Sequence, residues 1–550
     1  MLKRLLTLLL TAILALSSAT LIACVNGGGG DEYSSRPNKV TLAYAYGGYG
    51  TEYWDVLAKD FMDNYSEDIY LVMEPIYDVN ARPRIQGGTP DGDIVAVSQD
   101  MFRNSTVLEE LSDLLNRKAL GEEKTIKEKI GQAKYDYYYE GSLNGIYQLP
   151  GGNGYGYNWA YNKSVLDDAF DGDYTLPKTS KEFFAFGDEL LEKEIFLTSA
   201  ALKETSDDYL VYAFQVWFAQ MVGAEGYTQF YSGNYFNKET SKYELAETSP
   251  LNIETNKQAI LSAYEVAHKL CYRGNDYLHP SSASMKLMDN NQVFAGGGYS
   301  FNEAKSAFLF TGAWYEHEIR DLVKDELVEQ NVYGAMRVPV ISDIVLNLEY
   351  RGENNAYMTD EMLSQIVTAV DEGKTSFDGV SQNDFDRIKE SRNMLLEQIC
   401  SELVIPTIKE ESKRESIYTV LQYLATDHAQ ELAAKTMGGI GMFQFGYTVD
   451  FDKLGITPTN LVKDFNDIKN TAVTIDHACV NNTFKRASSI EWYTVNSGVL
   501  ASSIYDMTED SKNADSKANA LKMYDSLMGK YSGRAWTTAI ETYKEAVGLK

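Results

Sequence analysis

The sequence predicts an α/β protein built from two lobes, and three observations lead to that prediction. The chain begins with alternating strands and helices that are typical of a parallel sheet, and a second block of mixed strands and helices follows. Its 550 residues exceed what one ordinary hydrophobic core holds. One very large domain is the alternative, which the two separate α/β blocks disfavour.

The first residues have the layout of an export signal that ends in a lipidation site. Two basic residues precede an apolar run, and the string LIAC ends at Cys24. This pattern predicts that residues 1–23 are cleaved, that the thiol of Cys24 carries a lipid, and that residues 24–38 form a flexible tether. An uncleaved transmembrane anchor is the alternative. In either case we expect the bulk of the chain on the extracytoplasmic face of the cell membrane.

Residues 39–144 are predicted to form the first part of lobe 1. Alternating apolar residues indicate a strand over 40–46, and Thr51 is placed to cap the helix that follows. The apolar run 93–97 indicates a buried parallel strand, ahead of a helix capped by Thr106. Because parallel sheets bind ligands at the carboxyl ends of their strands, the loops after these two strands are candidate sites.

Three further parts complete the predicted order. Residues 145–340 are expected to form the first part of lobe 2, and residues 341–445 the second part of lobe 1. Within the latter, 342–401 is a polar elaboration with helical patches that include 385–400. Residues 446–550, which are mainly helical in pattern, are expected to complete lobe 2.

Strands and helices also alternate within the predicted lobe 2. A strand over 155–161 leads into a helix, and a strongly apolar helix begins at Tyr209. An amphipathic helix over 256–274 follows. A strand over 306–312 then leads to a loop and a helix at Trp314. The pattern therefore remains mixed α/β to the end of this block.

The chain is strongly acidic, with a formal net charge of −29 at pH 7. Such a charge repels phosphate backbones and anionic lipid headgroups, so we expect no nucleic-acid partner and membrane attachment through the lipid alone. A neutral ligand fits best. Tyrosine supplies 39 of the aromatic residues, against 22 Phe and 6 Trp. Because tyrosine offers a ring face and a hydroxyl together, this composition suits carbohydrate.

We expect neither a metal ion nor a cofactor. The five histidines are scattered, and Cys271, Cys400 and Cys479 lack metal-binding spacing, while a disulfide among them is left open. The chain has no GxSxG or HExxH sequence, so no catalytic residue is predicted. The glycine-rich loop at 438–441 lacks the lysine and serine of a phosphate-binding loop, and it indicates a hinge or a cleft loop instead.

Several segments resemble the sugar-binding family of extracellular solute-binding proteins of bacterial ABC importers, which includes maltodextrin-binding protein. The strings LNGIYQLP and WAYNKSVLDDAF are similar to a family turn and to its Tyr-Asn-Lys helix start. Residues 290–321 resemble a family strand that ends in Gly-x-Trp, here with Trp314, although Ala304 stands where the family has glycine. The likeness spans most of 39–527 but not 342–401.

The resemblance implies a two-lobed, periplasmic-binding-protein-like fold of type II with a hinge and a cleft between the lobes. Closure of the lobes around a ligand would present a surface to a membrane permease. The expected partners are a neutral carbohydrate, the transmembrane subunits of an ABC permease and the membrane. The protein is expected to be a monomer.

The resemblance also suggests ligand-binding residues. Trp314 is the first choice, because its family counterpart stacks on a sugar ring; a core tryptophan is the alternative. Trp492 and Tyr161 correspond to further stacking rings of the family. Asp100 corresponds to a carboxylate that accepts sugar hydroxyls, and the alternative for Asp100 is capping a turn.

Six further candidates come from local pattern. Tyr46, Gly48 and Tyr49 follow the first strand, where glycine lets the backbone approach a ligand, although a plain flexible loop gives the same pattern. Tyr157 and Trp159 stand with Tyr161 at every second position of a strand, so the strand face that they share could line the cleft. The last is a cation that could reach a ligand or pair with an acid. The six are Tyr46, Gly48, Tyr49, Tyr157, Trp159 and Arg337.

Together these features predict a lipid-anchored substrate-binding component of an ABC importer, which captures a carbohydrate, in the first instance an oligosaccharide, between its lobes. A surface glycoside hydrolase is the alternative from another class, because paired carboxylates are common in such enzymes. A passive glycan-binding lipoprotein is a third possibility. The sequence does not identify the sugar or its length.

Overall fold

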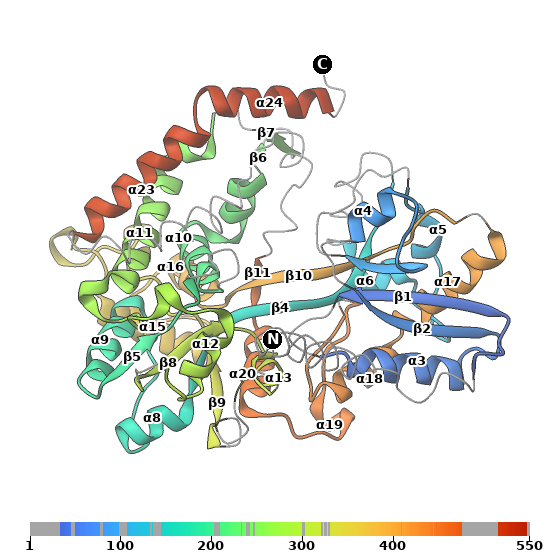
Figure 1. Ribbon diagram of the computed structural model, residues 1–550. Coiled ribbons are helices and arrows are strands. Elements are labelled where there is room, and N and C mark those ends of the chain that lie inside the picture. The colour runs from blue at the N-terminus through green and yellow to red at the C-terminus, as the bar shows by residue number, and fades with distance from the viewer. Residues whose placement is uncertain are drawn as a thin grey trace, which may run out of the picture.

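The protein is described by a computed structural model. The described residues are 33–45, 50–76, 81–97, 107–132, 135, 145–202, 209–232, 234–237, 242–245, 248–299, 303–320, 323, 327, 330–408, 410–443, 445–475 and 515–546. Figure 1 shows two bodies of helices and strands joined across the middle of the molecule by two long strands. We call the body that holds β1 lobe 1 and the other body lobe 2.

Lobe 1 is built on the parallel strands β1, β2 and β3. Leu42 of β1 lies beside Met73 of β2 on one side and Ile94 of β3 on the other. The apolar face of α3, which includes Trp54 and Phe61, is buried, whereas Thr51 precedes the helix without the predicted side-chain capping hydrogen bond. The elements are β1 (Asn38–Ala45), α3 (Glu52–Asn64), β2 (Ile69–Ile76), α4 (Ala81–Gln86), β3 (Ile94–Val97), α5 (Ser112–Leu115), α6 (Ile126–Ile130), α17 (Glu411–Leu424) and α18 (Asp427–Thr436).

Lobe 2 surrounds a core of aromatic rings. Trp159 lies at its centre against Phe183, Trp217 and Phe310. The elements are α8 (Lys163–Phe170), α9 (Ser180–Leu191), β5 (Ile195–Thr198), α10 (Leu210–Ser232), β6 (Asn234–Asn237), β7 (Lys242–Leu245), α11 (Glu254–Cys271), α12 (Leu287–Phe294), β8 (Lys305–Thr311), α13 (Tyr315–Glu318), β9 (Tyr333–Met336), α15 (Asp360–Asp371), α16 (Gln382–Arg392), α20 (Asn460–Asn470), β11 (Val473–Ile475), α23 (Ser516–Tyr531) and α24 (Arg534–Ala546). The short helix α19 (Phe451–Leu454) lies beside α18 of lobe 1, where its Lys453 pairs with Glu431.

The two lobes share one sheet. Its strand order is β2-β1-β3-β10-β4-β8-β5, with β9 beside β4 and β11 beside β10. The strands β4 (Leu149–Asn162) and β10 (Met394–Val404) are antiparallel and run from one lobe into the other. We call these two the crossing strands. A third connection follows α18, which packs on α3 in lobe 1, and leads to α20, which packs on β9 in lobe 2.

The crossing strands differ from the sequence prediction. A helical patch was predicted over 385–400, but α16 ends at Arg392 and β10 begins at Met394. The apolar residues of this stretch fit a helix as well as a strand, and pairing with β4 decides between them. β4 is likewise longer than the predicted strand over 155–161 and begins at Leu149, because β10 supplies partners along its glycine-rich first half.

The helix predicted from Thr106 is also wrong for the part that is described. Leu108 forms a bridge with Pro406, and the helix α5 spans only Ser112–Leu115. Residue Thr407 donates its backbone N–H to the carbonyl of Val107 at 3.0 Å. Leu108 is thus drawn into the sheet edge by the chain that leaves β10, and this tertiary pairing overrides the helical spacing.

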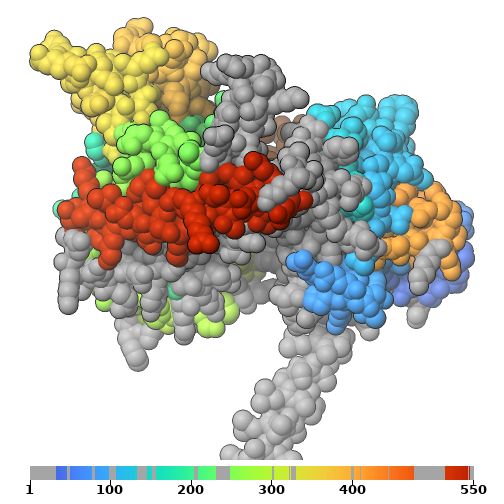
Figure 2. All heavy atoms as spheres, turned by 90° about the horizontal axis from the view of Figure 1, so that it is seen from above, coloured from blue at the N-terminus to red at the C-terminus, as the bar shows by residue number. Residues whose placement is uncertain are grey.

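The elaboration over 342–401 was predicted to belong to lobe 1, but residues 342–392 pack against lobe 2. Thr179 of lobe 2 donates to Asp360 at 2.8 Å, and Ser391 donates to the carbonyl of Gln220 at 3.0 Å. Figure 2 shows this segment, coloured yellow to orange, on the side of lobe 2 away from lobe 1. Among the described residues, the chain returns to lobe 1 through β10, which follows this segment.

Candidate ligand-binding site

Four aromatic residues meet where the crossing strands enter lobe 2. Tyr157 of β4 lies 4.6 Å from Tyr212 and 5.3 Å from Trp314, measured between ring centroids. Tyr209 packs edge-on against Trp314 at 5.8 Å. We call Tyr157, Tyr209, Tyr212 and Trp314 the aromatic cluster. It joins a crossing strand, the start of α10 and the turn between β8 and α13.

The positions of the Tyr157 and Trp314 rings follow from the backbone of the elements that carry them. Tyr157 lies one residue before Asn158, the first residue of β4 that pairs with β8, so its ring sits at the lobe boundary. Gly312 precedes the turn, and a Cβ atom at this position would overlap the Trp314 ring. The glycine therefore lets the tryptophan fold back over β8.

The cluster combines enclosed and accessible rings. Tyr157 and Trp314 have exposed fractions of 3% and 4%, whereas Tyr209 and Tyr212 are half-buried. Flat rings pack on the C–H faces of a sugar, and tyrosine hydroxyls can pair with its hydroxyls. None of the four carries a charge near neutral pH. This surface suits an uncharged ligand with both apolar and hydroxylated faces.

Three of the sequence-predicted candidates lie elsewhere in lobe 2. Trp159 belongs to the core, with none of its surface exposed. Tyr161 and Arg337 line a separate surface groove beside β9 and α15. Burial raises the pKa of Tyr161 to about 12, and Asp464 adds to the shift. The structure thus brings together Trp314 and Tyr157 but not these three.

Arg337 is occupied by protein partners in this groove. Its guanidinium donates to the hydroxyl of Thr471 at 2.6 Å and to the side chain of Asn393. Burial lowers the pKa of Arg337, and the nearby Arg392 adds to that effect. These contacts fit a structural role in joining β9, α16 and α20.

The remaining candidates fall outside the described residues. They are Tyr46, Gly48, Tyr49, Asp100, Trp492 and the lipidation site Cys24. Their roles stay predictions. Among the cysteines, Cys271 is buried at the end of α11, and Cys479 also lies outside the described part.

Sequence reasoning did not select Tyr209 and Tyr212. They stand three residues apart around the start of α10, so they share one helix face. Their spacing is a signal that was available, but the strongly apolar helix that they begin pointed only to core packing. Within the described residues, no group of three or more histidine, cysteine or acidic side chains is arranged to hold a metal ion.

Comparisons with known proteins identify the fold. No protein-family model matches the chain, and no curated protein matches it. A probable secreted solute-binding lipoprotein from Streptomyces coelicolor is 11% identical with a TM-score of 0.51, over 90% of this chain and 98% of that chain. A cyclic alpha-maltosyl-1,6-maltose binding protein from Arthrobacter globiformis is 12% identical with a TM-score of 0.51, over 90% of this chain and 99% of that chain.

A chitin oligosaccharide binding protein gives a third match. It is 14% identical with a TM-score of 0.50, over 89% of this chain and 98% of that chain. At such low identity these matches show the fold. The chain has the two-lobed α/β fold of solute-binding proteins, which confirms the predicted fold class.

Proposed function

We propose that this protein is the lipid-anchored, substrate-binding component of an ABC importer, and that it captures a carbohydrate between its lobes. The observation that carries the proposal is the aromatic cluster, which lies where the crossing strands enter lobe 2. Rings at a hinge can contact a ligand that both lobes enclose. The two described neighbours that are named for a ligand bind oligosaccharides, which supports the choice of carbohydrate.

The remaining parts of the proposal rest on the sequence. Cys24 would carry the lipid, and a permease in the same membrane would receive the ligand after closure. In the described part of the chain, no helix is long and apolar enough to cross a bilayer. The net charge of −29 supports an uncharged ligand, because it disfavours anionic ones.

The proposed ligand contacts are the four rings of the aromatic cluster. Asp100, Tyr46, Gly48, Tyr49 and Trp492 are proposed to add contacts from the loops that surround the cleft. Trp159, Tyr161 and Arg337 are not included, because the core or the groove beside β9 holds them. Their contribution to binding is proposed to be indirect.

A thermal-shift screen of mono- and oligosaccharides, followed by calorimetry on the best ligand, tests the function. A ligand that binds only the folded protein raises the melting temperature by mass action. Product analysis after the same incubation separates binding from hydrolysis, because cleaved glycosidic bonds would contradict the proposal. A passive glycan-binding lipoprotein would retain insoluble polymer without binding soluble oligosaccharide.

Substituting Tyr212→Ala should weaken binding of the best carbohydrate about tenfold, since loss of a stacked ring should cost about 1.4 kcal/mol of binding free energy. Tyr212 is only half-buried, so the protein should still fold. Tyr357→Ala is the matched control, because Tyr357 is 50% exposed on the elaboration of lobe 2. Equal affinities of the two variants by calorimetry would remove Tyr212 from the site.

A further inference from the structure

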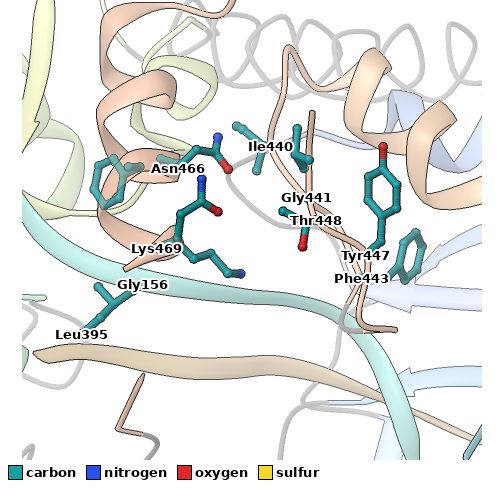
Figure 3. Close-up of a pocket in the computed structure, with 13 residues that line it drawn as sticks. Gly156, Leu395, Ile440, Gly441, Phe443, Tyr447, Thr448, Asn466 and Lys469 are labelled. Atoms are coloured by element: carbon teal, nitrogen blue, oxygen red, sulfur yellow. The ribbon is translucent and has the colours of Figure 1, made fainter. Parts of the chain in front are cut away.

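A cavity of about 290 Å³ lies between the lobes on the opposite side of the crossing strands from the aromatic cluster. Figure 3 shows its walls: β4 and β10 run along one side, α20 stands on the second, and residues 440–443 and 447–449 form the third. Side chains alternate between the two faces of a strand. Gly156 lines the cavity on one face of β4. The ring of its neighbour Tyr157 lies on the opposite face, together with the other rings of the aromatic cluster. We call this space the rear cavity.

The residues that line the rear cavity suit an uncharged ligand. Its walls combine apolar side chains with neutral hydrogen-bonding groups. The charged lining residue is Lys469, and its amine lies 2.9 Å from a carboxylate oxygen of Glu397, so the charge is compensated. The lining residues that matter for recognition are Leu395, Phe443, Phe465, Thr448, Asn466 and Asn470.

Buried polar groups without partners adjoin this lining. Asn158 lies two residues after the lining residue Gly156, on the same face of β4. Its partner in β8 is Thr311, which lies two residues before the lining residue Ala313. Asn158 and Thr311 have exposed fractions of 0% and 1%. Neither amide atom of Asn158 nor the hydroxyl of Thr311 has a hydrogen-bond partner within the described part of the chain. Asn158 and Thr311 do not themselves line the cavity, so a ligand there would form hydrogen bonds with the lining side chains of Thr448, Asn466 and Asn470.

The third connection between the lobes forms one wall of the rear cavity. Gly438 and Gly439 adopt φ angles of +63° and +103°, a region that favours glycine, directly after α18. Phe443 then packs edge-on against Trp54 of lobe 1 at 5.3 Å, while Asn466 of lobe 2 donates to the carbonyl of Gly439 at 3.3 Å. Residues from both lobes therefore enclose the cavity.

We propose that the rear cavity is a second ligand site, which binds a small uncharged ring compound bearing hydrogen-bonding groups, and that its occupation favours closure of the lobes on the aromatic cluster. Rotation of the lobes about the crossing strands must widen one face when it narrows the other. A ligand in the rear cavity holds the lobes apart on that side of the crossing strands. It therefore favours closure of the lobes on the opposite side, where the aromatic cluster lies. The effect on closure rests on the proposed function, whereas the existence of the site does not.

Binding to the rear cavity is tested with cyclohexanol and 2-piperidone as probes, by saturation-transfer NMR on the full mature chain. We expect about millimolar affinity, because such small ligands have few contacts. Thr448→Trp and Asn470→Trp should each abolish the signal by filling the cavity from opposite walls; both residues are exposed, so folding should be retained. Absence of binding to the unsubstituted protein would overturn the proposal.

Two controls locate the probes. Lys463→Trp places the same bulk on an exposed position of α20 that is not part of the cavity lining, and binding should be unchanged. Tyr212→Ala alters the aromatic cluster, and binding should again be unchanged. Loss of the probe signal in Tyr212→Ala would place the probes at the front face and overturn the proposal.

The effect on closure has two measurements. Thr448→Trp should bind the best carbohydrate about fivefold more tightly than the unsubstituted protein, and unchanged or weaker affinity would contradict the coupling. Small-angle scattering with cyclohexanol should show a smaller radius of gyration, and this measurement needs no carbohydrate. If the probes bind but no carbohydrate does, the rear site stands and the proposed function fails.

Discussion

At the scale of single residues, one buried carboxyl stands out near the aromatic cluster. Glu318 lies on α13, four residues after Trp314, with an exposed fraction of 9%. Its Oε2 atom has no hydrogen-bond partner among the described residues. Burial raises the pKa of Glu318 to about 7, although Asn291 partly offsets the shift. The carboxyl is therefore protonated more readily in the folded chain than in the unfolded one.

This pKa difference predicts how stability depends on pH. Between about pH 4.5 and 7 the folded chain holds a proton on Glu318 that the unfolded chain has released, so stability falls as pH rises through this window. Glu318→Gln should remove about 2 kcal/mol of that fall, and the variant should gain stability relative to the original chain at pH 8 but not at pH 5. Urea unfolding at both pH values measures the difference.

Glu361→Gln provides the matched control, because Glu361 is exposed on α15. It should leave the pH dependence of stability as it is in the unsubstituted chain. An equal pH dependence for Glu318→Gln and the unsubstituted chain would show that the carboxyl is not held protonated by the fold.

Single residues of the site were partly predictable from the sequence. Trp314 and Tyr157 were both candidates, one because a strand end and a glycine precede it and the other because of its place on a strand, and the structure brings their rings together. Their role in ligand binding stays a prediction. Strand alternation also selected Trp159, but it cannot distinguish a cleft from a core, and α9 and α10 cover this part of the strand face. Sequence spacing alone does not show which helix covers a strand.

At the scale of elements, the crossing strands determine how the lobes are joined. Helices whose apolar residues recur with a clear helical spacing, such as α3 and α11, were predicted correctly from the sequence. β10 was predicted as helix in its first half, because its mixed apolar and polar residues fit either period. Its strand conformation depends on a partner more than 200 residues earlier in the chain, which local pattern does not reveal.

Close packing between the crossing strands predicts a sensitive glycine. A Cβ atom at Gly156 would lie 2.5 Å from Cδ1 of Leu395, so Gly156→Ala should destabilise the protein by about 1–3 kcal/mol. Adding Leu395→Ala should recover part of the loss. Urea unfolding provides the measurement. Gly529→Ala is the control, because it lies in α23 with no atom near the added Cβ and should be neutral or slightly stabilising.

At the scale of the whole molecule, the fold places two surfaces on opposite faces of one hinge. The aromatic cluster occupies one face, and the rear cavity occupies the other. Among the residues that the structure describes, two strands and one glycine-containing segment join the lobes, so relative rotation changes both surfaces in opposite directions. A change in the angle between the lobes would therefore alter both surfaces at once.

The most direct test of the account is small-angle scattering of the mature chain with and without its best carbohydrate at saturating concentration. If the lobes close on the ligand, the radius of gyration should decrease on binding, and Tyr212→Ala should show the same decrease only at about tenfold higher ligand concentration. A radius of gyration that stays constant while calorimetry shows saturation would contradict capture by closure of the two lobes.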